Sequence, residues 1–149
     1  MKKIVILKND RTGDLFTSLK TINLIFNKHK NETIEIFLSK INKNFNFLFK
    51  NKKIRIINLQ INLFDKLKIL FYFLFNKIDS VYILTPKNFY FYLPLIFFFK
   101  RIKFYGICVD SFKMRPGNFL RSFLYKKIVI NRIVIKPRKS TYETQQKLI

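Results

Sequence analysis

Short apolar runs alternate with amphipathic runs along most of the chain. The first apolar run, 4–7, is rich in β-branched residues and ends in a polar loop that contains Gly13 and Asp14. Apolar residues then recur at helical spacing, at Leu15, Leu19, Ile22 and Phe26. This order predicts a buried strand, a loop and a helix over 15–26.

The same alternation predicts an α/β fold for the whole chain. Further strands are expected over 33–38, 54–59, 79–85 and 102–106, and helices over 40–49, 63–75 and 88–99. Gly106 is the last residue of the fifth expected strand. The pattern is completed by a loop over 110–117, a short helix over 119–125, apolar runs at 128–130 and 133–135 and a closing helix from 141. Alternating strands and helices favour a doubly wound, Rossmann-like parallel sheet with right-handed crossovers. We therefore expect one domain over 1–137, with 138–149 as the start of a linker helix.

Polar residues gather in the loop after the first strand. In an open parallel sheet this position lies at the carboxyl end of the strand, where ligands bind. Asp14 at the start of the helix is either a reacting carboxylate or a helix N-cap, which aspartate favours. Asp10 is either an Asx-turn residue or a second ligand contact. The loop lacks the glycine spacing of a dinucleotide fingerprint or a P-loop, so no cofactor is expected.

This stretch resembles a known signature. It consists of Lys8, Asp10-Arg11 and Gly13-Asp14-Leu15, with Ser18 and Ile22 beyond, in the order strand, basic residue, loop and helix. The pattern resembles the amino terminus of the lipopolysaccharide heptosyltransferases, which are glycosyltransferases of family 9 with the two-domain GT-B architecture. Thr12 and Lys20 differ from that pattern, which has an aliphatic residue and a proline at these positions.

The resemblance implies a function and a set of site residues. The reaction would be inverting transfer of a sugar from a nucleotide-sugar donor, such as ADP-heptose, to a lipopolysaccharide core or related glycolipid. Asp14 would be the general base, and the acceptor contacts would come from Lys8, Asp10, Arg11, Thr12 and Gly13; no metal is implied. The resemblance covers only the amino-terminal, acceptor-binding half, so the donor-binding domain is expected to be absent and the chain to be a poor catalyst alone.

Charge widens the range of expected partners. The 149 residues are 49% hydrophobic and carry a formal net charge of +22, which attracts nucleic acid, anionic lipid or phosphorylated glycolipid. Alternatively, the lysines are a solubilising surface inflated by base composition. No nucleic-acid-binding motif is present, so nucleic acid ranks last. The alternative to an enzyme is a non-catalytic basic protein of the same fold that binds anionic glycolipid or a membrane surface.

Other features of the sequence indicate where in the cell the chain is located. The apolar tracts at 69–75 and 89–99 are too short to span a bilayer, so peripheral membrane contact is the most that is expected. The amino terminus has a strand pattern without the features of a signal peptide, which predicts a cytoplasmic location, with peripheral contact at the inner face of the cytoplasmic membrane. The single cysteine, Cys108, excludes an intrachain disulfide. His29 is expected as a cation at a helix end or on the surface, without a carboxylate arranged beside it.

Overall fold

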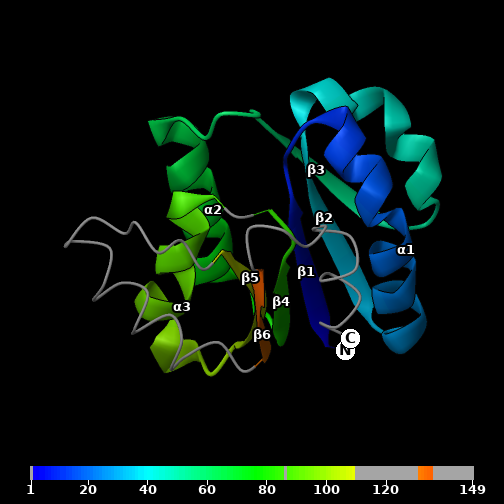
Figure 1. Ribbon diagram of the computed structural model, residues 1–149. Helices are drawn as coiled ribbons and strands as arrows, with labels where there is room; N and C mark the ends of the chain where they lie inside the picture. The colour runs from blue at the N-terminus through cyan, green and yellow to red at the C-terminus, as the bar shows by residue number, and fades with distance from the viewer. Residues whose placement is uncertain (1, 86, 110–130, 136–149) are drawn as a thin grey trace.

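Six parallel strands form one sheet in the order β3-β2-β1-β4-β5-β6 (Figure 1). The computed structural model describes residues 2–85, 87–109 and 131–135. The strands are β1 (Lys3–Lys8), β2 (Thr33–Ser39), β3 (Lys53–Ile57), β4 (Ser80–Ile83), β5 (Lys103–Val109) and β6 (Asn131–Ile135). Strand order reverses on the two sides of β1, as in doubly wound α/β folds, so the predicted fold class is confirmed.

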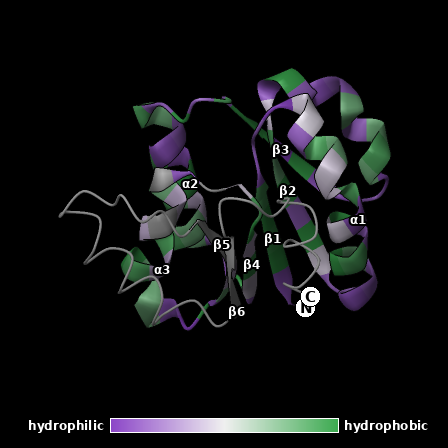
Figure 2. Ribbon diagram, in the orientation of Figure 1, coloured by the Kyte–Doolittle hydropathy of each residue, from purple (hydrophilic) through white to green (hydrophobic). Residues whose placement is uncertain are grey.

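Helical segments cover both faces of the sheet. α1 (Thr12–Lys28) and η1 (Lys40–Phe49) pack on one face, and α2 (Leu63–Phe75) with the segments that follow β4 packs on the other (Figure 1). Figure 2 shows apolar residues along the central strands and in both helical layers. Because both faces are covered, β1 reads as a continuous apolar run, with Ile4 and Ile6 facing α1 and Val5 and Leu7 facing α2.

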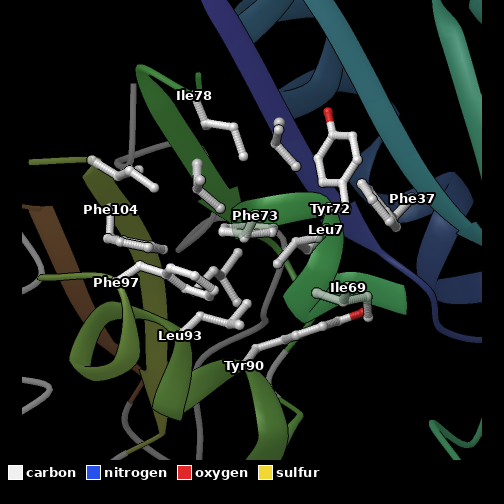
Figure 3. Packing of buried hydrophobic residues seen from close by; sticks show 14 of the residues in the cluster. Leu7, Phe37, Ile69, Tyr72, Phe73, Ile78, Tyr90, Leu93, Phe97 and Phe104 are labelled. Carbon is white, nitrogen blue, oxygen red and sulfur yellow. The ribbon is translucent and has the colours of Figure 1, made fainter. Parts of the chain in front are cut away.

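The core on the α2 side is largely aromatic. The ring of Phe73 lies 5.4 Å from that of Phe97 and 6.5 Å from that of Phe104, measured between centroids (Figure 3). Tyr72 meets Phe37 edge to face at 5.1 Å. These contacts join α2 to β2, to β5 and to the segment after β4, which fixes the position of α2 over the sheet.

Two predicted helices differ from the observed segments. The residues at 40–49 form a 3-10 helix rather than an α-helix, in a stretch whose asparagines are weak helix formers. The predicted helix at 88–99 is broken into η2 (Asn88–Tyr92), α3 (Leu93–Ile96) and η3 (Phe98–Lys100). Pro94 lies in the first turn of α3, where its missing N–H is tolerated. Because proline cannot donate a backbone hydrogen bond, the helical hydrogen bonding of the preceding segment does not continue through this residue.

The predicted strand boundaries also shift. β3 ends at Ile57 rather than at 59, and β4 covers only the middle of the predicted 79–85. The fifth strand was predicted to end at Gly106, but β5 continues to Val109, so Gly106 lies inside it, in register with Ile83 of β4 and Arg132 of β6. The predicted features at 110–117, 119–125, 128–130 and 138–149 lie outside the described residues, whereas the run at 133–135 forms part of β6.

His29 is held in a network that the sequence did not reveal. It is the C-cap of α1, as predicted at a helix end, but its side chain is largely buried. Its Nδ1 lies 2.6 Å from Glu32 Oε2, and its Nε2 lies 2.9 Å from the Tyr82 hydroxyl. The expectation that no carboxylate is arranged with His29 is therefore wrong. Since Tyr82 is fully buried, the cluster ties the end of α1 to the sheet.

A buried carboxylate lies in the middle of β2. The side chain of Glu35 is 1% exposed and is surrounded by Arg55 Nε at 2.6 Å, Lys3 Nζ at 3.2 Å and Lys53 Nζ at 4.0 Å. Burial by itself would raise the pKa of Glu35, but the Arg55 guanidinium, with Tyr72 and Lys3 beside it, outweighs burial and lowers this pKa below its ordinary value of 4.5. Glu35 is therefore an ionised partner that joins β1, β2 and β3.

Replacing Arg55 by Met is expected to destabilise the fold at neutral pH by about 1–2 kcal/mol. Because the folded-state pKa of Glu35 is lowered, its stabilisation is present above 4.5 and is lost as pH falls through the folded value. The difference between Arg55→Met and wild type should thus shrink in acid, as measured by urea unfolding at neutral pH and below pH 4.5. The more distant and exposed Lys53 is the control, since Lys53→Met should have a smaller effect. If the loss of stability in Arg55→Met relative to wild type were the same at both pH values, this role of Glu35 would be contradicted.

Candidate functional site

The loop between β1 and α1 lies at the carboxyl edge of the sheet, where the strand order reverses. β1 ends at Lys8, and α1 begins at Thr12, so three residues make the connection. The neighbouring strands β2 and β4 end at the same edge because all the strands are parallel. This is the position at which open α/β sheets bind ligands, and the polar residues singled out from the sequence are gathered there.

A buried ion pair supports the loop from below. Lys8 is 1% exposed, and its Nζ donates to Asp10 Oδ2 at 2.5 Å. The same oxygen accepts a hydrogen bond from Thr85 Oγ1 at 3.1 Å, whereas the buried Asp10 Oδ1 has no hydrogen-bond partner within the described residues. Lys8 is thus the internal counter-ion of Asp10 and does not present its ammonium group to a ligand at the surface.

The pKa of Asp10 is raised above its ordinary value of 3.8. Burial is the largest cause, since it disfavours the charged carboxylate. The charge and hydrogen bond of Lys8, with the hydrogen bond of Thr85, lower the pKa in part, and the negative charge of Asp14 raises it further. The ionised form of Asp10 therefore depends on Lys8.

The backbone of the loop is fixed by two side chains from the next strand and helix. Ser39 Oγ and Asn42 Nδ2 both donate to the Asp10 carbonyl, at 2.7 and 3.0 Å. The amide oxygen of the fully buried Asn42 also accepts a hydrogen bond from Thr12 Oγ1 at 2.8 Å. The hydroxyl of Thr12, which replaces an aliphatic residue of the resembled pattern, is therefore used to anchor the loop to η1.

Asn9 connects this loop to those after β3 and β4. Its Nδ2 donates to the Asn58 carbonyl at 3.1 Å, and its Oδ1 accepts a hydrogen bond from the Tyr90 hydroxyl at 2.6 Å. Asn58 in turn donates its Nδ2 to Asp65 Oδ2 at 2.8 Å, in the first turn of α2. Three loops at the carboxyl edge are thus joined by buried hydrogen bonds, which makes the edge a preorganised surface.

Three of the predicted site residues remain exposed above this support: Arg11, Gly13 and Asp14. Arg11 is the N-cap residue of α1 and forms no side-chain cap, so the N-cap alternative for Asp14 is wrong. Asp14 lies in the first turn, and its carboxylate has no hydrogen bond or ion pair within the described residues. The space beside Gly13 is open, because a Cβ built there meets no atom within 4 Å.

The first turn of α1 also offers backbone donors. The first helical hydrogen bond runs from the Leu15 amide to the Arg11 carbonyl at 3.0 Å. The amides of Thr12, Gly13 and Asp14 therefore precede the helical ladder and are available to an anionic group above Gly13. Together with the Arg11 guanidinium, these neutral donors make a surface beside the exposed Asp14 carboxylate that can bind an anionic group.

An open pocket lies at the same edge of the sheet, on the α2 side. Its volume is about 470 Å³, and its walls come from the loops after β3 and β4, both of which contact the β1 loop. The lining residues are Gln60, Ile61, Lys66, Lys87, Phe89 and Tyr92. Two lysines beside two aromatic rings suit a ligand that combines acidic groups with a sugar or another flat apolar surface.

Sequence reasoning found the loop but missed the residues that hold it. Ser39 is the last residue of β2 and Thr85 comes just after β4, the two strands that flank β1, so a polar residue at the end of each apolar run was a usable signal. Asn42 offered no such signal, because it lies among many asparagines and lysines. Within the described residues no cluster of His, Cys, Asp or Glu is arranged to hold a metal ion.

Comparison with protein families and with curated proteins gives no match. Among solved structures, Escherichia coli heptosyltransferase WaaC with ADP-2-deoxy-2-fluoro heptose is similar, with a TM-score of 0.61 at 8% identity, covering 98% of this chain and 46% of that one. The structure of WaaC with ADP has a TM-score of 0.58 at 12% identity, and the match covers 98% of this chain and 45% of that one. MurG of Acinetobacter baumannii has a TM-score of 0.56 at 15% identity, and the match covers 94% of this chain and 43% of that one.

These similarities establish the fold of the chain. Nearly all of it matches part of a GT-B glycosyltransferase, and it spans less than half the length of each structure it matches. The resemblance found in the sequence is therefore confirmed at the level of the fold. At such low identity the match shows the architecture alone.

Proposed function

We propose that this chain is the acceptor-binding half of a heptosyltransferase-type glycosyltransferase. The donor would be a nucleotide sugar such as ADP-heptose, and the acceptor a sugar of the lipopolysaccharide core or a related glycolipid. The observation that carries the proposal is the exposed Asp14 carboxylate on the first turn of α1, above a loop held by buried hydrogen bonds. The fold match to WaaC, whose structures contain ADP or an ADP-heptose analogue, supports the same reaction class.

The chemistry needs one base at the acceptor. In inverting transfer, an acceptor hydroxyl attacks the anomeric carbon, the bond from that carbon to the nucleoside diphosphate breaks, and the hydroxyl proton passes to a base. Asp14 is assigned this role because its carboxylate is exposed and unpaired within the described residues. The nearby Asp10, which is largely buried and ion-paired with Lys8, is not available for proton transfer.

The other residues at the loop divide into ligand contacts and supports. Arg11 and the open amides around Gly13 are assigned to an acidic group of the acceptor, since a guanidinium binds carboxylate or phosphate through two parallel hydrogen bonds. Lys66 and Lys87 extend this positive surface into the neighbouring pocket. Lys8, Asp10 and Thr12 hold the loop in shape and act as positioning residues.

The donor is assigned to a second domain. The chain corresponds to less than half of the matched GT-B structures, so the nucleotide sugar would be bound by a part equivalent to their remaining length. Glycolipid acceptors lie in membranes, and the proposed place of action is the inner face of the cytoplasmic membrane. The competing function is a non-catalytic protein that binds anionic glycolipid through the same edge.

Acceptor binding by the chain alone tests the proposal. Isothermal titration with a phosphorylated lipid A–core oligosaccharide should show binding that falls roughly tenfold in Arg11→Gln, because a charge-assisted hydrogen-bond pair is lost. Lys20→Gln is the matched control, since Lys20 is an exposed cation further along α1 and its loss changes the net charge equally. Equal binding by both variants, or no binding by wild type, would contradict the assignment of this edge to the acceptor.

A further inference from the structure

The outer side of α2 and the adjoining segment η3 expose an unusual number of aromatic rings. Phe75 is 78% exposed and stacks on the exposed Phe71, with ring centroids 6.1 Å apart. Other exposed rings on the same two segments are Phe64, Phe98 and Phe99. We call these five phenylalanines the aromatic face. A cluster of this kind on one surface is typical of a contact with another molecule or with a membrane.

The two segments of the aromatic face are physically joined. Lys100 Nζ donates to the Phe73 carbonyl at 2.7 Å and to the Asn76 carbonyl at 3.3 Å, and it also contacts the Leu74 carbonyl. The end of η3 is thereby fixed to the carboxyl end of α2 (Figure 1). The exposed rings of Phe98 and Phe99 therefore lie on a segment that is held next to the carboxyl end of α2.

An apolar groove enlarges this surface on its β3 side. It lies between α2 and the edge strand β3 and has a volume of about 740 Å³. Its lining includes Phe64, Leu67, Phe71 and Phe75 from α2 and Ile54, Ile56 and Ile57 from β3. The groove and the aromatic face share three phenylalanines, so apolar contact area extends from the sheet edge across the helix.

Cations are interleaved with these rings. Lys68 lines the groove together with Phe64, Phe71 and Phe75, and its Nζ lies 4.4 Å from the centroid of the Phe64 ring. At the carboxyl end of α2 an open pocket of about 500 Å³ is lined by Lys2, Lys3, Lys77, Asp79, Lys100 and Arg101. The acidic residue of α2, Asp65, is buried, so the surface of this helix presents positive charge only.

We propose that the aromatic face docks on the surface of an anionic phospholipid bilayer. The phenylalanines would enter the boundary between headgroups and acyl chains, and the lysines would extend to the lipid phosphates, as expected for an interfacial amphipathic helix. Charge complementarity selects this occupant, because the chain carries +22 and an anionic bilayer is negative. No helix among the described residues has the length and apolar character needed to cross a membrane, and interfacial docking requires none.

The same features argue against protein occupants. A second copy of the chain would bring another +22 to the surface, so pairing of two aromatic faces is opposed by charge repulsion. The cores of protein–protein interfaces are depleted in lysine, whereas Lys68 lines the groove and Lys77 lies just beyond the carboxyl end of α2. A bilayer accepts lysines and phenylalanines together, because the two side chains occupy different depths.

Docking along α2 would also bring the candidate site to the bilayer. α2 starts at the carboxyl edge, where Asn62 caps it and Asp65 binds Asn58, and it ends next to the start of β4 at the opposite edge. A bilayer that lies along the helix therefore reaches the carboxyl edge on the α2 side, where the pocket lined by Lys66 and Lys87 lies. The docking itself depends only on the aromatic face and its cations, so it does not rest on the proposed function.

Vesicle flotation of the full chain tests the docking surface. The vesicles contain either phosphatidylcholine alone or an equimolar mixture with phosphatidylglycerol, without any glycolipid. Wild type should bind the anionic vesicles, less so as salt is raised, and should not bind the neutral vesicles. Phe71→Ser/Phe75→Ser should weaken binding roughly tenfold or more, because two rings leave the interface. Lys68→Gln/Lys77→Gln should weaken it roughly 30-fold, as expected for two cations near an anionic surface.

Matched variants on the opposite face of the sheet are the controls. Ile41→Ser/Phe47→Ser removes two exposed apolar residues from η1, and Lys40→Gln/Lys43→Gln removes two exposed lysines from the same segment. Both should bind as wild type does, and circular dichroism should show that all variants are folded. Equal losses in the η1 and α2 variants would overturn the proposal in favour of non-specific attraction.

Two further outcomes would also overturn the docking proposal. One is the absence of binding to anionic vesicles at low salt. The other is a concentration-dependent dimer in analytical ultracentrifugation that Phe71→Ser/Phe75→Ser abolishes, since the aromatic face would then be covered by a second copy. Asp14→Asn should leave vesicle binding unchanged, which separates failure of the docking surface from failure of the proposed transferase function.

Discussion

Asp14→Asn is expected to lower sugar transfer by roughly 10²–10⁴-fold in a protein that contains this chain together with a donor-binding domain. Asparagine keeps the size and polarity of the side chain but cannot accept the proton of the attacking hydroxyl. The loss should appear in the maximal rate, because acceptor binding is assigned to Arg11 and to the backbone amides of the first turn rather than to Asp14. Initial rates with a nucleotide sugar and a phosphorylated core oligosaccharide measure it.

The surroundings of Asp14 allow Asp14→Asn to remove the carboxylate without disturbing other contacts. The Asp14 carboxylate is exposed and has no hydrogen bond or ion pair within the described residues, so the change should alter stability by less than about 0.5 kcal/mol. Asp14→Glu is the companion variant, because it keeps a carboxylate at a shifted position and should retain part of the rate. Full activity in Asp14→Asn would refute the base assignment, and a complete protein with no transfer at all would favour the non-catalytic alternative.

The fold was predictable to the extent that it depends on local periodicity. α2 occupies the predicted residues, and β1, β2 and α1 differ from prediction only at their ends. The failures lie where a local pattern competes with other constraints. Pro94 divides an apolar run that otherwise has helical spacing, and Gly106 is held in β5 by pairing with strands on both sides.

The candidate site was predictable only in its contiguous part. Lys8, Asp10, Arg11 and the residues up to Asp14 belong to one loop, and a single stretch of sequence displays them together. Their supports come from 29, 32 and 75 residues away, at Ser39, Asn42 and Thr85. Those contacts depend on which strands are neighbours, and periodicity predicts strands without fixing their order.

Burial is the property that changed the roles of the predicted residues. In sequence, Lys8 and Arg11 are equivalent cations beside a loop, and both were expected to contact the acceptor. In the structure Lys8 is the last residue of β1 and is enclosed by the neighbouring strands, whereas Arg11 stands at the exposed start of α1. Two cations only three residues apart in the sequence are therefore proposed to have different roles, Lys8 as a positioning residue and Arg11 as a ligand contact.

Lys8→Met is expected to destabilise the fold by about 3–5 kcal/mol at neutral pH, because it leaves the Asp10 carboxylate buried without a counter-ion. Removing Lys8 should raise the already elevated pKa of Asp10 further. A carboxyl group with a raised folded-state pKa stabilises the fold below its unfolded value, here 3.8, and this stabilisation is lost as pH rises through the folded value. The defect of Lys8→Met should therefore diminish in acid, as urea unfolding at several pH values can show.

Two companion variants separate the ion pair from simple loss of a side chain. The double variant Lys8→Met/Asp10→Asn should recover much of the stability, because no buried, unpaired charge is then left at either position. Asp10→Asn alone leaves the buried Lys8 ammonium group without a partner and should therefore also destabilise the fold. Lys20→Met is the exposed control and should stay within about 0.5 kcal/mol of wild type. If Lys8→Met were as stable as that control, or equally defective at every pH, the pair would not support the loop. Asp14 and Arg11 would then need another explanation for their fixed position, since the loop that carries them would not depend on Lys8.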